Sequence, residues 1–265
     1  MGYRLLISIV VLITVFGFTT QTEEPLSLEQ QAIVSASRGA TWLLEYPEEF
    51  KDHGILWVLN SINEKYCEPN ISVAREIDGR LETVQNHPIE YAYLRLFDPT
   101  AQHQLTRDIL SERKKYFDDI LVPSLYCDIE KTPLHTESTI RTYSNQSGYT
   151  LTHAFLALLW MKDRGCLNES LSDLLKQTAL SVSKEQNSSP LFGDLFAERT
   201  AFLLYGDYKN LVHENWIKNI VDAQEYSGGW STKQGSMIFG TEENPHTSVL
   251  SMWALVQYTN ECPFE

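Results

Sequence analysis

Apolar residues recur at helical spacing along almost the whole chain, and this periodicity limits what the chain can fold into. Residues three and four apart share one face of a helix, whereas a half-buried strand alternates apolar and polar residues. The sequence has no convincing run of β-branched residues with that alternation. We therefore expect an all-α fold.

The expected helices come in pairs. The first member of each pair is amphipathic and the second is apolar around most of its circumference, as when an outer helix covers a buried inner one. The expected outer helices are Leu26 to Glu45, Ile71 to Val84, Gln104 to Phe117, Glu169 to Ser183 and Lys209 to Val221. The expected inner helices are Gly54 to Tyr66, Pro88 to Phe97, Thr150 to Lys162, Leu191 to Tyr205 and Pro245 to Tyr258. Because the pairs recur at roughly 40 to 50 residues, we expect about five α-hairpins.

The segment from Val122 to Gly148 departs from this pattern. It contains Pro123 and Pro133 among many serine and threonine residues, so we expect a long loop, and such loops are often functional. His135 and Glu137 lie in this segment. They are candidates for a lid over a site, and the simpler interpretation is that they are solvated loop residues.

The N-terminus has the order of a signal peptide. Arg4 precedes the apolar run from Leu5 to Phe18, and small polar residues follow. An apolar stretch of roughly 14 residues is short for a bilayer, which needs about 20 in a helix. We expect a cleaved signal peptide at 1–20 and no stable membrane insertion afterwards; a retained anchor is the alternative. No Pro/Gly/Ser-rich linker divides residues 21–265, so we expect one secreted or luminal domain.

The negative net charge of the chain narrows its possible binding partners. The chain has 21 Lys and Arg against 35 Asp and Glu, so phosphate-rich partners are repelled and nucleic acid is not an expected partner.

The four cysteines have no C-x-x-C spacing, and in an exported protein they predict two disulfides with three possible pairings. We favour Cys166 with Cys262, because one follows an apolar helix and the other closes the C-terminus.

Four N-x-S/T sequons agree with export and predict a glycoprotein. Each falls in a segment expected to be a loop or the start of a helix, where a glycan can be accommodated. Their asparagines are Asn70, Asn145, Asn168 and Asn187, and the last sequon is weakened by Pro190 directly after it.

Two neighbouring segments carry a resemblance. From Trp216 to Trp230 the chain reads WIKNIVDAQEYSGGW, and from Pro245 to Leu255 it reads PHTSVLSMWAL. They resemble an outer helix, a Gln-to-Trp turn with two glycines, and the following His-Thr-rich inner helix of the α/α-toroid (terpenoid cyclase/protein prenyltransferase-like) superfamily. The match covers about a sixth of the chain and implies an α/α toroid, an incomplete barrel, without implying an activity.

The turn itself has a physical interpretation. We expect the side chain of Gln224 to cap carbonyl groups at the end of the outer helix, and Gly228 and Gly229 to allow positive φ. Trp230 is expected to seal the gap between two hairpins.

The chain departs from the superfamily at its catalytic motifs. The D-x-D-D motif of protonating triterpene cyclases and the G-C-G-E-Q of thioester domains are absent. His246 resembles the zinc-binding histidine of protein prenyltransferases, but no Asp-x-Cys partner accompanies it. These activities are therefore not carried over.

The resemblance implies that the inner helices are parallel, so their N-termini would converge on one rim. Ionisable groups in those first turns are His87, Glu90, His153, Asp194, Glu198 and His246. We predict a site of His153, His246, Asp194 and Glu198. These residues act either as general acids and bases, or as a metal site in which His153, His246 and Asp194 bind a divalent metal such as zinc. The simpler interpretation is a set of capping or core residues, including an ion pair between Glu198 and Arg199.

Three tyrosines are candidates for an aromatic lining of this site, although packing at the hairpin junctions is the simpler role. They are Tyr143, Tyr149 and Tyr226.

Two functions stay open at this point. One is a hydrolase or lyase that uses the four predicted residues. The other is a non-catalytic toroid that holds a small-molecule or protein ligand in its cavity.

Overall fold

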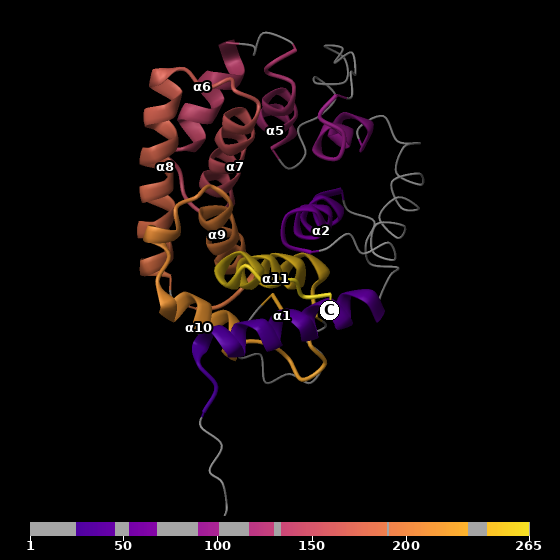
Figure 1. Ribbon diagram of the computed structural model, residues 1–265. Coiled ribbons are helices and arrows are strands. Elements are labelled where there is room, and N and C mark those ends of the chain that lie inside the picture. The colour runs from indigo at the N-terminus through magenta and orange to yellow at the C-terminus, as the bar shows by residue number, and fades with distance from the viewer. Residues whose placement is uncertain are drawn as a thin grey trace, which may run out of the picture.

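The computed structural model describes residues 25–45, 53–67, 90–100, 117–129, 134–189, 191–232 and 243–264. Within these ranges the chain is helical and contains no strand, and an isolated bridge joins Ser231 to Glu243. The all-α prediction is confirmed. The helices, labelled as in Figure 1, are α1 (Leu28–Glu45), α2 (His53–Tyr66), η2 (Glu90–Leu96), α5 (Asp118–Leu125), α6 (Leu134–Tyr143), α7 (Tyr149–Asp163), α8 (Glu169–Ser188), α9 (Asp194–Tyr205), η3 (Lys209–Leu211), α10 (Glu214–Asp222) and α11 (Pro245–Thr259).

Most predicted helices agree closely with the observed ones. The predicted inner helices correspond to α2, α7, α9 and α11, and the predicted helix from Pro88 is the 3-10 helix η2. The outer helix predicted over Lys209 to Val221 is divided into η3 and α10. The helix predicted at Ile71 to Val84 lies outside the described residues, as do the predicted signal peptide at 1–20 and nearly all of the helix predicted at Gln104 to Phe117.

Helix α11 lies at the centre of one end of the molecule. Its start follows from local sequence, because Pro245 occupies the first turn and the side chain of Asn244 accepts a hydrogen bond from the Thr247 N–H at 3.0 Å. Helices α1, α9 and α2 pack around it, and almost its whole length is buried. Helix α7 is buried in the same way, among α5, α6, α8 and α9. The buried side chains of all these helices form one hydrophobic core.

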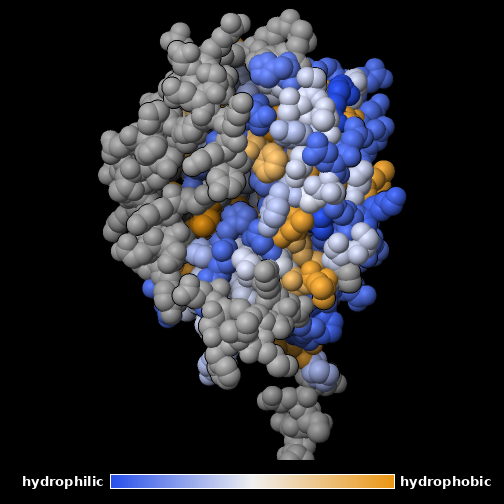
Figure 2. Space-filling model, turned by 180° about the vertical axis from the view of Figure 1, so that it is seen from behind, coloured by the Kyte–Doolittle hydropathy of each residue, from blue (hydrophilic) through white to orange (hydrophobic). Residues whose placement is uncertain are grey.

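In Figure 1, α8, α10 and α1 run along the outside of the molecule, while α7, α9 and α11 lie further in. None of the helices in the described ranges combines the length and the apolar content that crossing a bilayer requires. The exposed large hydrophobic side chains include Leu26, Val34, Leu44, Ile129, Leu180 and Leu191. On the described part of the face in Figure 2, hydrophobic residues form separate patches among hydrophilic ones.

The prediction of a loop from Val122 to Gly148 is wrong, because α5 and α6 occupy much of it. In α6, the hydroxyl groups that suggested a loop donate to carbonyl groups one turn earlier: Thr139 to His135 at 2.7 Å and Thr142 to Ser138 at 2.9 Å. In α5, Pro123 is buried within the helix against the core. His135 and Glu137 are therefore helical residues and do not form a lid loop.

Two disulfides are present, as predicted, but the favoured pairing of Cys166 with Cys262 is wrong. Cys67 is joined to Cys262, and Cys127 to Cys166. Helix packing explains this pairing. Cys67 follows α2, which packs against α11 just before Cys262; Cys127 and Cys166 follow α5 and α7, which also pack together.

The turn from Gln224 to Trp230 connects α10 to the N-terminal helix α1. The Gln224 side chain was expected to cap carbonyl groups at the end of its own helix. It instead donates to the carbonyl groups of Gly228 and of Ser35 in α1, each at 2.8 Å. Trp230 is fully buried, and its ring N–H donates to the Ile220 carbonyl at 2.7 Å. The backbone N–H of Trp230 donates to the Ser248 hydroxyl in α11 at 2.8 Å, so the turn joins three helices.

The two glycines of this turn have different roles. Gly228 adopts a φ of 109°, which favours glycine, as expected. Gly229 does not have a positive φ; a Cβ atom there would lie 2.8 Å from the Glu243 side chain and 2.9 Å from that of Trp42. Gly229 is therefore required for close packing.

Candidate active site

The first turns of α7, α9 and α11 meet at one place. Tyr149 begins α7, Asp194 begins α9, and His246 is the second residue of α11. The Tyr149 hydroxyl donates to Oδ2 of Asp194 at 2.7 Å, and Nδ1 of His246 lies 2.9 Å from Oδ1 of the same carboxylate. Asp194 is thus the point where the three helices meet.

Asp194 is held as a carboxylate by these neighbours. Burial is the largest single influence and raises its pKa, but the hydrogen bond and charge of His246, with hydrogen bonds from Tyr149 and Thr247, outweigh burial and lower the pKa to about 2. The Thr247 hydroxyl donates to Oδ1 at 2.7 Å. A carboxylate at the first residue of a helix is also favoured by the helix dipole.

The contact with an ionised Asp194 determines which nitrogen of His246 carries the proton. A carboxylate only accepts hydrogen bonds, so Nδ1 donates, and in the neutral ring the basic lone pair is on Nε2. The His246 side chain is 45% exposed, whereas that of Asp194 is 15% exposed. The pair thus combines a shielded carboxylate with an imidazole that reaches solvent.

Tyr149 keeps its proton at neutral pH. Burial raises the pKa of its phenol, and the nearby Asp194 carboxylate raises it further. The phenol therefore acts as a hydrogen-bond donor to Asp194 and orients the carboxylate toward His246.

His153 and Glu198 form a second, more deeply buried pair. Nδ1 of His153 lies 3.6 Å from Oε1 of Glu198 and 2.8 Å from the carbonyl oxygen of Tyr149, to which it donates. The Thr152 hydroxyl also donates to Glu198, whose side chain is 1% exposed. Burial raises the pKa of Glu198, although the charge of His153 and the hydrogen bond from Thr152 act in the opposite direction.

A cavity of about 630 Å³ opens beside the first pair. Its described lining is Ser147, Gly148, Tyr149, Glu185, Ser189, Leu191, Gly193, Asp194, Leu195, Phe196, Arg199, Thr232, Asn244 and His246. Among the four predicted site residues, Asp194 and His246 line it, while His153 and Glu198 do not. The lining is mostly polar and includes the apolar side chains of Leu191, Leu195 and Phe196.

Arg199 and Glu185 form a further charged pair in the cavity wall. Nη2 of Arg199 lies 3.0 Å from Oε2 of Glu185, and the guanidinium is almost fully buried. Glu185 also accepts the N–H of Gly148 at 3.0 Å, which ties the end of α8 to the start of α7. The simpler interpretation of the sequence expected an ion pair between Arg199 and Glu198. In the structure, Arg199 instead forms its ion pair with Glu185.

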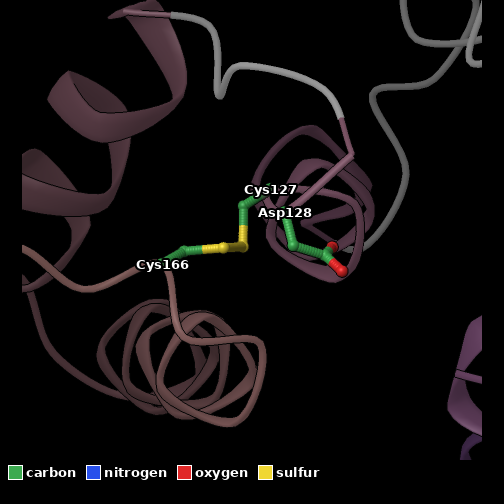
Figure 3. A group of neighbouring side chains, drawn as sticks. All are labelled: Cys127, Asp128 and Cys166. Carbon is green, nitrogen blue, oxygen red and sulfur yellow. A yellow bond between two sulfur atoms is a disulfide. The ribbon is translucent and has the colours of Figure 1, made fainter.

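The predicted metal ligands are not close enough together to bind one metal ion. His153, His246 and Asp194 do not form a group whose ligand atoms all lie within 4.8 Å of one another; among the described residues only Cys127, Asp128 and Cys166 do so. Figure 3 shows that the two cysteines of this group are joined in a disulfide beside Asp128. Disulfide sulfurs are not thiolates, and Asp128 is bound by Arg95 at 2.5 and 2.8 Å, so this group is an ion pair beside a cross-link.

The remaining sequence candidates are scattered or outside the described residues. His87 and the side chain of Glu90 lie outside them. Tyr226 is fully exposed and does not line the cavity, and Tyr143 lies near Asp119, with 3.5 Å between its hydroxyl and Oδ2.

Sequence reasoning missed Glu185 and Thr247 as parts of the site. Glu185 lies in the last turn of the amphipathic outer helix α8, beyond the predicted end of that helix at Ser183, and has no local signal. Thr247 directly follows His246, and its position in the first turn of an inner helix was a usable signal.

Chemically, the arrangement around Asp194 suits general base catalysis. An imidazole oriented by a buried carboxylate can accept a proton at Nε2 and be stabilised as the imidazolium. His246 lines the cavity, which provides space for a substrate beside its side chain.

Comparison with known proteins gives no assignment for this site. No protein-family model, no curated protein and no solved structure matches the chain.

Proposed function

We propose that this chain is an enzyme, a hydrolase or lyase of the secretory pathway or the extracellular space, with His246 as its general base. The observation that carries the proposal is the 2.9 Å contact between Nδ1 of His246 and the Asp194 carboxylate at the wall of a cavity. A carboxylate placed this way selects the tautomer that makes Nε2 the base.

The same geometry supports both reaction types. In a hydrolase, Nε2 takes a proton from water while the water oxygen attacks the substrate carbon. In a lyase, Nε2 takes a proton from one substrate carbon, and the bond between the neighbouring carbon and its leaving group breaks. The imidazolium then returns the proton to the leaving group, and Asp194 stabilises the positive charge in between.

We assign His153 and Glu198 a positioning role in this proposal. They do not line the cavity, but His153 donates to the Tyr149 carbonyl at 2.8 Å. Tyr149 in turn donates to Asp194, so the buried pair fixes the residue that orients the carboxylate.

Location and fold form the second part of the proposal. The two disulfides support an oxidising compartment, which agrees with a signal peptide at 1–20 and a single domain over 21–265. The alternation of outer and inner helices in Figure 1 and the Gln224 to Trp230 turn support an α/α toroid.

The experiment is a turnover screen with matched histidine variants. The secreted full chain is tested on chromogenic esters, amides and glycosides and on uronic-acid polysaccharides, with His246→Gln compared with His213→Gln, an exposed histidine. We expect kcat to fall about 10²–10⁴-fold in His246→Gln alone, as for loss of a general base. Equal turnover by both variants would contradict the proposal.

A non-catalytic binding module is the second candidate. The apolar side chains in the cavity lining, Leu191, Leu195 and Phe196, favour it because they could hold a ligand without chemistry. This candidate is supported if wild-type protein turns over none of the substrates and a small molecule co-purifies with it and is lost on blocking the cavity with Leu195→Trp.

A further inference from the structure

Two of the predicted sequons lie at the edge of the cavity. The last residue of the sequon Asn145-Gln146-Ser147 lines the cavity, and so does the last residue of Asn187-Ser188-Ser189. A chain extends at most about 3.6 Å per residue, so each asparagine lies within roughly 7 Å of a lining residue.

The two sequons also lie beside each other, although 42 residues separate Asn145 from Asn187 in the sequence. Glu185, two residues before Asn187, accepts the backbone N–H of Gly148 at 3.0 Å, directly after Ser147. This contact joins the end of α8 to the start of α7 at the cavity wall. Both asparagines are exposed.

Both asparagine side chains can carry a glycan without a change in their conformation. The Asn145 side-chain amide donates to the Arg141 carbonyl at 2.8 Å, and an amide has a second N–H. Substituting one hydrogen therefore leaves this contact possible. Asn187 is in the last turn of α8, where its exposed side chain points away from the core.

We infer that N-linked glycans on Asn145 and Asn187 flank the cavity and limit its access to small molecules or the ends of chains. This inference rests on the proposed passage through the secretory pathway. In the transfer, Nδ2 of asparagine bonds to the anomeric carbon of a lipid diphosphate-linked oligosaccharide. The carbon–oxygen bond to the diphosphate breaks, the amide loses one proton to solvent, and the lipid diphosphate leaves; nothing is oxidised or reduced.

The third described sequon provides an internal control. Asn168 caps the opposite end of α8, and its side chain accepts the Leu171 N–H at 2.9 Å. At about 1.5 Å per residue, this end lies roughly 28 Å from Asn187. A glycan on Asn168 therefore does not crowd the cavity. Ser170→Ala removes this sequon while keeping the capping asparagine.

The first measurement is site occupancy. The full chain is expressed in eukaryotic cells, and glycopeptides of the secreted protein are mapped by mass spectrometry. We expect Asn145 and Asn187 to be occupied. Secreted protein with both asparagines unmodified overturns the inference and leaves the proposed location intact, whereas protein retained in the cytosol overturns both.

The second measurement is access to the cavity. Leu191 lines the cavity and is 81% exposed, so Leu191→Cys introduces a thiol at its edge, and all four native cysteines are in disulfides. The thiol is labelled with a small maleimide and with a polyethylene glycol maleimide of protein size. Leu44→Cys, on α1 and 50% exposed, is the matched control thiol.

We expect the large reagent to label Leu191→Cys several-fold more slowly than the small one, with no such difference for Leu44→Cys. Enzymatic removal of the glycans from folded protein restores the rate, as does Asn145→Gln combined with Asn187→Gln, whereas Ser170→Ala does not. Occupied sites with equal labelling before and after glycan removal overturn the inference.

Discussion

Replacing Asp194 with asparagine removes the negative charge at the meeting point of three helices and keeps the shape of the side chain. The pKa of Asp194 falls from an ordinary value of 3.8 to about 2. At about 1.4 kcal/mol per pKa unit, the charged form contributes roughly 2 kcal/mol to folding. Because the pKa in the folded state is depressed, this contribution is complete above pH 3.8 and is lost as pH falls through about 2.

We therefore expect Asp194→Asn to lower the free energy of unfolding at pH 7 by about 2 kcal/mol, measured by urea denaturation. The difference from wild type should shrink at pH 3. The control is Asp222→Asn, because Asp222 pairs with Lys218 at 2.6 Å while 48% exposed, and such pairs contribute under about 1 kcal/mol. Equal stability of Asp194→Asn and wild type at pH 7, or a difference that does not depend on pH, refutes the reasoning.

Three further stability predictions are checked by the same denaturation assay. Cys127→Ser with Cys166→Ser opens a loop of 39 residues and should cost about 4 kcal/mol, as the entropy of the unfolded chain predicts. Gly228→Ala should cost about 1–3 kcal/mol, because φ is 109° and the new Cβ lies 2.6 Å from the Arg38 carbonyl oxygen. Glu198→Gln should leave neutral-pH stability unchanged or higher: burial raises the pKa of Glu198, so wild type loses stability as pH rises, and the glutamine variant does not. A large loss of stability in Glu198→Gln at pH 7 would show that its charge is required.

Helices with a strong apolar pattern were predictable from sequence, and short helices supported by tertiary contacts were not. The start of α11 follows from Asn244 and Pro245, which act within one turn of the chain. Helix α5 contains Pro123 and forms because its buried face packs on α7, a contact that no local pattern records. The disulfide pairing depended on the same unpredicted contact, since Cys127 follows α5.

The candidate site was partly predictable for a similar reason. Convergence of inner-helix N-termini placed Asp194 and His246 in one region, and the structure joins them at 2.9 Å. The division into a pair that lines the cavity and a pair that does not was not predictable, because it depends on which side of each helix faces the cavity. The part that Glu185 plays in the cavity wall was also not predictable, because it depends on the packing of the outer helix α8 on α7.

The central claim is that Asp194 fixes the proton of His246 on Nδ1 and leaves Nε2 as the base. Nitrogen-15 NMR of histidine-labelled protein reads this tautomer directly, with His246→Gln used to assign the signal. The account predicts that neutral His246 is protonated at Nδ1 in wild type and loses that preference in Asp194→Ala. A neutral His246 protonated at Nε2, or an unchanged spectrum in Asp194→Ala, would contradict it.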